Sequence, residues 1–586
     1  MSHRFRSLLS MLVILGFMFS ACTQQQSDPG ATPTLASPAN AIQVSIIYAP
    51  ESDLYLKEAI NQFNLAYAQG RNPLTGAALA SGERPIYVTG KTGSSGTVAQ
   101  AIVNAVIAPN NANVERPTIF APSVSHWLAL ANYQAGRQIF DLTNSPATAN
   151  APVVMAIWES RLRALQNANP GEEIGWSHLI EVLNDPKGWE SYGFTGRRTV
   201  YYGHTDPYIS STAISTLIAE FYASARYNAG FKERRLTLTE VNDTKVQDGV
   251  RRIEQLIKHY SSRTTEFKEY IAQGPDYLDF VALEENDLIY INQGKTQYRP
   301  PEKLVALYPA EGTFWHEHPF SVPNGDWVSA EQREAAKVFT DYVLSEVVQQ
   351  KVLEAGFRPA NSKVPLGYPI STDLGVDPNK PSTVLDVPDP AVIAAIQESW
   401  SFVKKQADVW LVIDVSGSMR DEDKIGQAKQ AALAFIDALQ PQSRVGLAVF
   451  NNEVTIVVEM DTYEKNKARL KERISSLSAD SGTALYDAIL QVMAQFQAEA
   501  DSNRIRAMVV LSDGQDTEST SKVRDVTTEI SKGREDLNPV IVIPVAYGKD
   551  ADVQSLNTIA RASATKVQSG DPNNIKAVLE VISSFF

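Results

Sequence analysis

The feature that most restricts the fold of this chain is an unbroken apolar run at 409–413 that ends directly in Asp414. A run without polar interruption is typical of a strand buried on both faces of a parallel sheet. Two further runs of this kind lie at 505–511 and 540–545, and helical patterns separate the strands. This alternation predicts a doubly wound, mostly parallel α/β sheet. Two short strands within 445–458, joined by a short polar connection, predict an antiparallel edge strand.

Polar side chains gather where a sheet of this kind binds ligands, at the carboxyl ends of its strands. They come from three separate segments and carry hard oxygen atoms: Asp414, Ser416, Ser418, Thr483 and Asp513. Two carboxylates nearly neutralise a divalent cation, and hydroxyls add ligands without adding charge. Such a set suits Mg²⁺ best, with Mn²⁺ or Ca²⁺ as alternatives. An ion held in this way retains a position for a carboxylate oxygen from a partner.

The order Asp-x-Ser-x-Ser, then Thr, then Asp resembles the metal-ion-dependent adhesion site of the von Willebrand factor type A domain. All five residues are present in this order, and the resemblance covers about 408–586. It implies a Rossmann-like fold and a protein partner bound through the cation.

The first residues form a targeting segment. Two arginines precede an apolar run at 8–19 that is too short to span a bilayer, an order typical of a secretory signal peptide. Cys22 is the only cysteine, and 19–22 resembles the lipobox of bacterial lipoproteins. The resemblance implies cleavage before Cys22 and lipidation of this residue. Such lipidation would anchor the protein on the extracytoplasmic side of the cell membrane.

Length and charge restrict the organisation and the partners. A chain of 586 residues is too long for a single hydrophobic core. The formal net charge of −14 opposes binding to phosphate backbones, so we expect no nucleic-acid partner. The predicted division is a signal peptide, a flexible tether, a two-lobed region, a linker with a helix, and a C-terminal domain. Their predicted bounds are 1–21, 22–40, 41–375, 376–405 and 406–586.

The region 41–375 contains a second series of strands and helices, including a glycine-rich segment at 90–97 and a helix over 330–355. The glycine-rich segment fits equally an anion site at a helix N-terminus and a turn with an N-capping hydroxyl. The helix followed by Gly-Phe-Arg-Pro-Ala-Asn at 356–361 is similar to the C-terminal lobe of extracellular solute-binding proteins. This resemblance implies two α/β lobes with a small solute in the cleft between them.

Candidate cleft residues lie at predicted strand ends and helix starts: Ser94, Ser95, Ser123, Trp127, His204 and Asp206. Hydroxyl residues at such positions also serve as caps. His316 and His318 would share one face of a strand, but no third metal ligand is recognisable. For this pair we expect a surface or structural role rather than metal binding.

These patterns favour a lipid-anchored extracytoplasmic protein that binds a partner through a divalent cation, with a solute-binding-like region beside it. The alternative is the substrate-binding receptor of an ABC-type transporter, with the C-terminal domain as an accessory. We expect no enzyme, because the sequence has no zincin helix, nucleophile elbow or cysteine nucleophile.

Overall fold

The computed structural model describes residues 36–586 except 256, 262–263, 499–503, 534–539, 564, 566 and 584–585. The predicted signal peptide, Cys22 and most of the predicted tether therefore lie outside the described residues. Within the described part of the chain, every helix is too short or too polar to cross a membrane.

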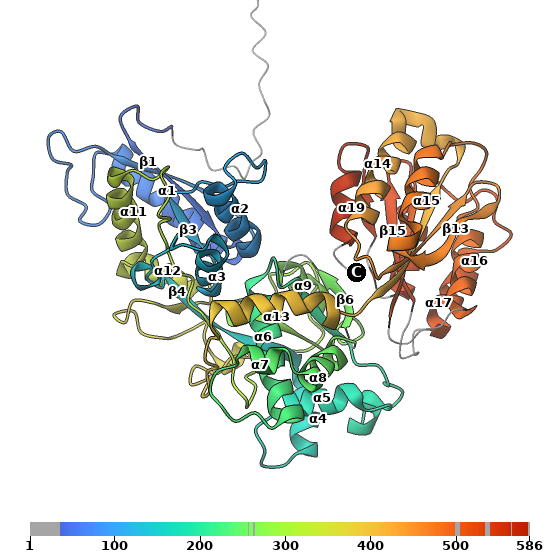
Figure 1. The fold of residues 1–586 in the computed structure, drawn as a ribbon, viewed down its shortest axis with the longest axis horizontal. Helices are drawn as coiled ribbons and strands as arrows, with labels where there is room; N and C mark the ends of the chain where they lie inside the picture. The colour runs from blue at the N-terminus through green and yellow to red at the C-terminus, as the bar shows by residue number, and fades with distance from the viewer. Residues whose placement is uncertain are drawn as a thin grey trace, which may run out of the picture. The chain divides into compact units, whose positions relative to one another are not determined.

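The first lobe is built on a parallel sheet with the strand order β2-β1-β3. Its strands are β1 (Ile42–Tyr48), β2 (Ile86–Thr92) and β3 (Ile119–Ala121). The helices around it (Figure 1) are α1 (Asp53–Ala68), α2 (Ser95–Ile107), α3 (His126–Ala135), α11 (Ala330–Val343) and α12 (Glu346–Glu354). The rings of Phe63 on α1 and Phe339 on α11 lie 5.0 Å apart. Segments far apart in the sequence therefore close one core.

The helix predicted over 330–355 is two helices, so that prediction is wrong in its middle. Ser345 has the extended backbone of an N-cap residue and begins α12. The side-chain amide of Gln349 donates to the carbonyl oxygen of Val343 at 3.0 Å. This bond satisfies a carbonyl group at the end of α11 that a continuous helix would have bonded internally.

The second lobe contains a mixed sheet with the order β10-β4-β7-β5-β6, and β8 and β9 also pair with β4. Its strands are β4 (Ala149–Trp158), β5 (Tyr202–Thr205), β6 (Ile257–Ser261), β7 (Phe280–Glu284), β8 (Leu304–Leu307), β9 (Trp315–His316) and β10 (Arg358–Pro359). Its helices are α4 (Glu159–Ala168), α5 (Trp176–Asn184), α6 (Ser211–Ala229), α7 (Leu238–Val241), α8 (Thr244–Glu254), α9 (Thr264–Ile271) and α10 (Glu285–Asn292). Helix α6 is buried along most of its length, so it forms the centre of this lobe.

Helix α13 (Pro390–Val403), which falls in the predicted connection 376–405, packs on the two-lobed region. It contacts α3, α6, α7 and α8. Ile393 and Ile396 are fully buried, and the side-chain amide of Gln397 donates to the carbonyl oxygen of Pro207 at 2.8 Å. This helix therefore belongs to the core of the two-lobed region rather than acting only as a connector.

The C-terminal domain has a sheet with the order β13-β12-β11-β14-β15-β16. Its strands are β11 (Ala407–Asp414), β12 (Arg444–Phe450), β13 (Val454–Thr462), β14 (Ile505–Ser512), β15 (Val540–Tyr547) and β16 (Gln568–Gly570). All neighbours are parallel except β12 and β13. The predicted mostly parallel sheet with an antiparallel edge strand is confirmed.

Helices cover both faces of this sheet (Figure 1): α14 (Lys424–Asp437), α15 (Tyr463–Ser476), α16 (Leu485–Ala498), α17 (Val523–Gly533), α18 (Val553–Ala562) and α19 (Ile575–Ser583). Successive side chains of β11 point to opposite faces. Leu411 belongs to the core that contains residues of α14, α15 and α19, whereas Val412 belongs to the core formed with α16, α17 and α18. This double burial explains the unbroken apolar run and places Asp414 at the carboxyl edge of the sheet.

The remaining short helical segments are 3₁₀ turns: η1 (Pro50–Ser52), η2 (Leu142–Asn144), η3 (Gly188–Tyr192), η4 (Thr372–Leu374) and η5 (Gly417–Asp423).

Replacing Ile396 tests whether α13 is part of the two-lobed core. Ile396→Ala should lower the free energy of unfolding of this region by about 2–5 kcal/mol, because it removes fully buried apolar volume. Hydrogen exchange of the full chain should accelerate in α6 and α8 and stay unchanged in β11 and β14. The control is Phe402→Ala, on the same helix but 67% exposed, which should have little effect. Unchanged exchange in α6 and α8 of Ile396→Ala would contradict the assignment.

Candidate functional site

The five predicted oxygen ligands lie together at the carboxyl edge of the C-terminal sheet. Asp414 is the last residue of β11, and Asp513 directly follows β14. The hydroxyl of Ser418 donates to Oδ1 of Asp513 at 2.7 Å, and the Oγ atoms of Ser416 and Ser418 are 3.1 Å apart. A Cβ added to the adjacent glycine, Gly514, would lie 3.8 Å from Oγ of Ser418 and 3.9 Å from Oγ1 of Thr483. Three segments far apart in the sequence therefore present their oxygens to one place.

Backbone hydrogen bonds hold the loop of Thr483 against the loop that follows β11. The N–H of Gly417 donates to the carbonyl oxygen of Ser481 at 2.9 Å, and the N–H of Asp480 donates to that of Val415 at 2.7 Å. Ser481 has a φ of 70°, which is uncommon for a residue other than glycine. These contacts hold the loop of Thr483 next to Ser416 and Ser418.

Both carboxylates of the site are fully buried. Asp414 accepts hydrogen bonds from the backbone N–H of Ser416 at 2.8 Å and from the hydroxyl of Ser512 at 2.7 Å. Burial nevertheless raises the pKa of Asp414 to about 6, and the charge of Asp513 also raises it. The site is therefore a place where positive charge is stabilising.

Lys424, the first residue of α14, supplies positive charge from within the chain. Its Nζ lies 2.7 Å from Oδ2 of Asp513, and its side chain is buried. Sequence reasoning missed this residue, because it lies in a charged run that fits a solvated helix start equally well. The carboxylate and hydroxyl oxygens fit a hard divalent cation, but such an ion would have to share Asp513 with this ammonium group or displace it.

A second candidate site is a cavity formed by residues of both lobes of the two-lobed region. Its lining is rich in hydroxyl groups and carboxylates and consists of Pro50, Glu51, Ser94, Ser95, Ser123, Ile209, Ser210, Ser211, Thr212, Thr264, Thr265, Glu284 and Asp287. Three of the predicted cleft residues, Ser94, Ser95 and Ser123, are among them. The indole N–H of Trp127 donates to the hydroxyl of a lining residue, Ser211, at 3.0 Å.

His204 and Asp206 are not in this lining. His204 is buried in the second lobe, where its ring lies 5.2 Å from that of Trp400 on α13. Asp206 accepts from the backbone N–H of Tyr208 at 2.8 Å and so orders the turn before α6. Both residues were predicted as cleft residues because they lie at the end of a strand. Their side chains instead contact α13 and the turn before α6.

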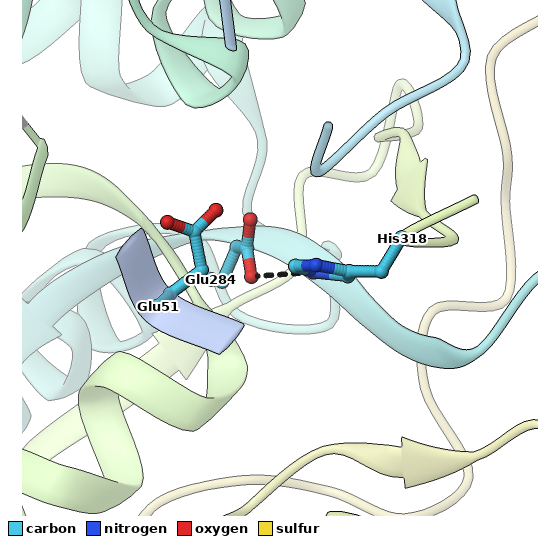
Figure 2. Close-up of side chains that lie close together, drawn as sticks. All are labelled: Glu51, Glu284 and His318. Carbon is cyan, nitrogen blue, oxygen red and sulfur yellow. Dashed lines mark hydrogen bonds and ion pairs between the residues drawn. The ribbon is translucent and has the colours of Figure 1, made fainter. Parts of the chain in front are cut away.

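Glu284, at the end of β7, is bonded by both histidines of the pair noted in the sequence (Figure 2 shows His318). His316 Nδ1 lies 2.7 Å from its Oε1, and His318 Nε2 lies 3.1 Å from its Oε2. Burial alone would raise the pKa of Glu284, but the two histidines outweigh it and lower the pKa to about 2. Both imidazoles are buried, so a surface role for them is wrong and a structural role fits.

Glu51, on η1, brings a second carboxylate to the same place (Figure 2). Ligand atoms of Glu51, Glu284 and His318 lie within 4.8 Å of one another. Burial raises the pKa of Glu51 to about 7, and the charge of Glu284 adds to this rise. The hydroxyl of Ser123 donates to Glu51. Sequence reasoning missed Glu51 and Glu284, because nothing near either residue in the sequence marks it as part of a cleft.

The charged residues of the lining are all acidic: Glu51, Glu284 and Asp287. Asp287 is paired with Lys268, whose Nζ is 2.9 Å away. Glu284 is held between two histidines. Among the acids of this lining, Glu51 is therefore the one whose charge depends most on pH near neutrality.

Glu51 should make the stability of the two-lobed region depend on pH. Its folded pKa of about 7 is above the ordinary value of 4.5, so its contribution is fully present below pH 4.5 and is lost as the pH rises through 7. Between pH 5 and pH 8, the midpoint temperature of thermal unfolding of the full chain should decrease less in Glu51→Gln than in the wild type. Glu58→Gln, which alters an exposed residue on α1, should follow the wild-type profile. Identical profiles for Glu51→Gln and the wild type would refute the assignment.

Two family models match the chain. The model described as bacterial extracellular solute-binding protein matches residues 75–377, and the model described as von Willebrand factor type A domain matches residues 408–580. Among curated proteins, an uncharacterized protein of Synechocystis is 34% identical over 105 residues, which cover 18% of this chain and 24% of that protein. Calcium-activated chloride channel regulator 1 of Bos taurus is 31% identical over 175 residues, 28% of this chain and 17% of that protein. The chain thus spans less than a quarter of the length of either relative.

Solved structures resemble each part of the chain. A von Willebrand factor type A structure from Catenulispora acidiphila has 23% identity and a TM-score of 0.28, and the match covers 31% of this chain and 42% of that chain. A periplasmic binding protein from Actinobacillus pleuropneumoniae, with exogenous fructose-6-phosphate bound, has 15% identity and a TM-score of 0.41, and the match covers 62% and 99%. The first family model matches more than half of the residues. The chain therefore belongs to the bacterial extracellular solute-binding protein family, and it carries a von Willebrand factor type A domain at residues 408–580.

Proposed function

We propose that this protein is a lipid-anchored extracytoplasmic receptor that binds rather than catalyses. Its von Willebrand factor type A domain binds a protein partner through a divalent cation, and its interlobe cavity captures a small polar solute. One observation supports the first activity above all. Asp414, Asp513 and three hydroxyls from separate segments lie together at one edge of the sheet.

The proposed cation, Mg²⁺ in the first place, would be held by Asp414, Ser416, Ser418, Thr483 and Asp513. When bound, it would supply an electrophilic centre that accepts a carboxylate oxygen from the partner. The chain's own task is to hold these oxygens in place, which the hydrogen bonds between the two loops accomplish. A partner would therefore meet a site whose protein part is already ordered.

Lys424 should weaken cation binding, because it places a positive charge on one of the two carboxylates. The Coulomb repulsion between two unit positive charges about 4 Å apart is about 4 kcal/mol at the effective dielectric constant of a protein surface. A lysine side chain has several rotatable bonds, and an entering cation would push the ammonium group away from Asp513, so the effect should be smaller than this figure.

Titration of the full chain with Mg²⁺, followed by calorimetry, tests the cation proposal. Asp414→Ala should abolish binding, because it removes a charged ligand. Lys424→Met should tighten binding about tenfold, which corresponds to about 1.4 kcal/mol. Lys429→Met, which removes a charge from the same helix away from the carboxylates, is the matched control and should leave the affinity unchanged. Absence of Mg²⁺, Mn²⁺ and Ca²⁺ binding by the folded wild type would reject the proposal.

The solute proposal follows from the lining of the cavity. Hydroxyl groups supply donors and acceptors, and the charged lining residues are all acidic. A solute with hydroxyl or amine groups and no net negative charge fits this lining best, because an anion would face Glu51 and Glu284. The family membership makes a substrate-binding receptor of an ABC-type transporter the second candidate function, with the same cavity as its site.

Lipid anchoring is proposed from the sequence around Cys22. Because this is the only cysteine of the chain, any thioether-linked lipid must be on it. In cells fed a labelled fatty acid, the wild type should be labelled and found in the membrane fraction. Cys22→Ser should be unlabelled and released, and Ser27→Ala in the predicted tether should behave as the wild type. Equal membrane association of Cys22→Ser and the wild type would contradict the anchor.

A further inference from the structure

A group of buried acceptor atoms in the second lobe lies outside both sites described above. It consists of His204 on β5, Glu220 on α6 and Glu254 at the end of α8. The side chains are 2%, 0% and 0% exposed, and one ligand atom of each lies within 4.8 Å of the other two. Three acceptors this close in an apolar interior need positive charge among them.

The hydrogen bonding of His204 defines which of its nitrogens carries the proton. Nδ1 lies 2.6 Å from the carbonyl oxygen of Thr205, and a carbonyl oxygen only accepts, so Nδ1 must donate. In a neutral ring, a proton on Nδ1 leaves none on Nε2. Nε2 then has a bare lone pair, and it has no hydrogen-bond partner among the described residues.

The two carboxyl groups are each held by one oxygen only. The hydroxyl of Tyr202 donates to Oε1 of Glu220 at 3.0 Å, and the hydroxyl of Tyr260 donates to Oε2 of Glu254 at 2.8 Å. In the described part of the chain, Oε2 of Glu220 and Oε1 of Glu254 accept no hydrogen bond from an N–H, a hydroxyl or a cationic side chain, and the only group that faces each of these carboxyls in this way is the other carboxyl. An outer donor that orients a ligand while its other atom stays free is the usual arrangement around protein-bound metal ions.

A single shared proton does not satisfy this group. The two carboxyls lie within hydrogen-bonding reach of each other, so a proton can lie between Glu220 and Glu254. That proton would leave Nε2 of His204 facing them without a donor. A divalent ion would accept all three lone pairs, and its charge would cancel the two carboxylates. The charge of Lys404 acts on Glu254, but its Nζ lies 4.5 Å from the ring centroid of Tyr260 and donates to the carbonyl oxygen of Phe586, so it bonds neither carboxylate.

We propose that His204, Glu220 and Glu254 bind a divalent transition-metal ion of the zinc class through Nε2 and the two free carboxylate oxygens. One imidazole and two carboxylates suit Zn²⁺, Mn²⁺ or Fe²⁺ better than Mg²⁺ or Ca²⁺, which prefer oxygen ligands alone. The site joins β5, α6 and α8, so the ion would fix the core of the second lobe. This inference is independent of the cation and solute functions proposed above.

Because the ligands are buried, the ion should enter during folding, and the test must load it there. The chain is produced with Zn²⁺ in the medium, carrying Asp414→Ala and Glu51→Gln to remove the other two candidate sites. After removal of loosely bound metal with a chelator, elemental analysis should find about one zinc per chain. Adding His204→Gln, which keeps a polar side chain but removes Nε2, should lower the zinc content at least tenfold.

Refolding the same parent chain with Co²⁺ tests the site by its visible absorption, without any further substitution. A site with nitrogen and oxygen ligands should produce visible d–d absorption bands, which refolding with Mg²⁺ should not produce. Equal zinc content with and without His204→Gln, or a folded parent chain that holds neither zinc nor cobalt, would overturn the proposal. The second result would assign a shared proton to the two carboxyls instead. Neither result would bear on Mg²⁺ binding at Asp414, which is measured on a chain without these changes.

Discussion

The cost of removing carboxylates from water governs every site of this protein. Asp414 and Asp513 are buried at a sheet edge and share the positive charge of Lys424. In the interlobe cavity, Glu284 is hydrogen-bonded by two imidazoles. In the core of the second lobe, Glu220 and Glu254 have only tyrosine hydroxyls, which donate hydrogen bonds but carry no charge. The three places differ in how much positive charge the chain itself supplies.

This difference gives each place a different chemical character. A carboxylate already bonded by histidines offers little to an incoming metal ion, so the Glu284 group serves better as an ordered acidic wall of the cavity. The edge of the C-terminal sheet has one lysine for two acids and is half neutralised. In the group around His204, the charge of Lys404 acts on Glu254 without a bond to it, so this group is the place where we propose an external cation.

The sequence was most informative where local pattern and position coincide. The apolar run before Asp414 predicted a strand buried on both faces, and parallel strands bring their ends to one edge, so Asp414, Asp513 and the hydroxyls could be placed together. Lys424, Glu51 and Glu284 could not be found in this way. Each matters because of what packs against it from a distant segment, and single-sequence patterns carry no record of such contacts.

The error over 330–355 has a physical cause as well. The helix predicted there satisfied the apolar periodicity throughout, but the amide of Gln349 competes for a backbone carbonyl and permits a break. The helix predicted within 376–405 is present as α13, and its apolar face is buried by α6 and α8, which the pattern alone did not identify. The apolar periodicity of a helix predicts that one of its faces will be buried, but it does not predict which other element buries that face.

Tyr260 has a consequence for communication along the chain. Its hydroxyl donates to Glu254 and also accepts from the backbone N–H of Lys405, just before β11 begins. Hydrogen bonds in series polarise one another, so a hydroxyl that gives its proton to a more negative acceptor becomes a better acceptor itself. A change in the charge of Glu254 would therefore alter the strength of the hydrogen bond between the Tyr260 hydroxyl and the backbone of Lys405, at the start of the C-terminal domain.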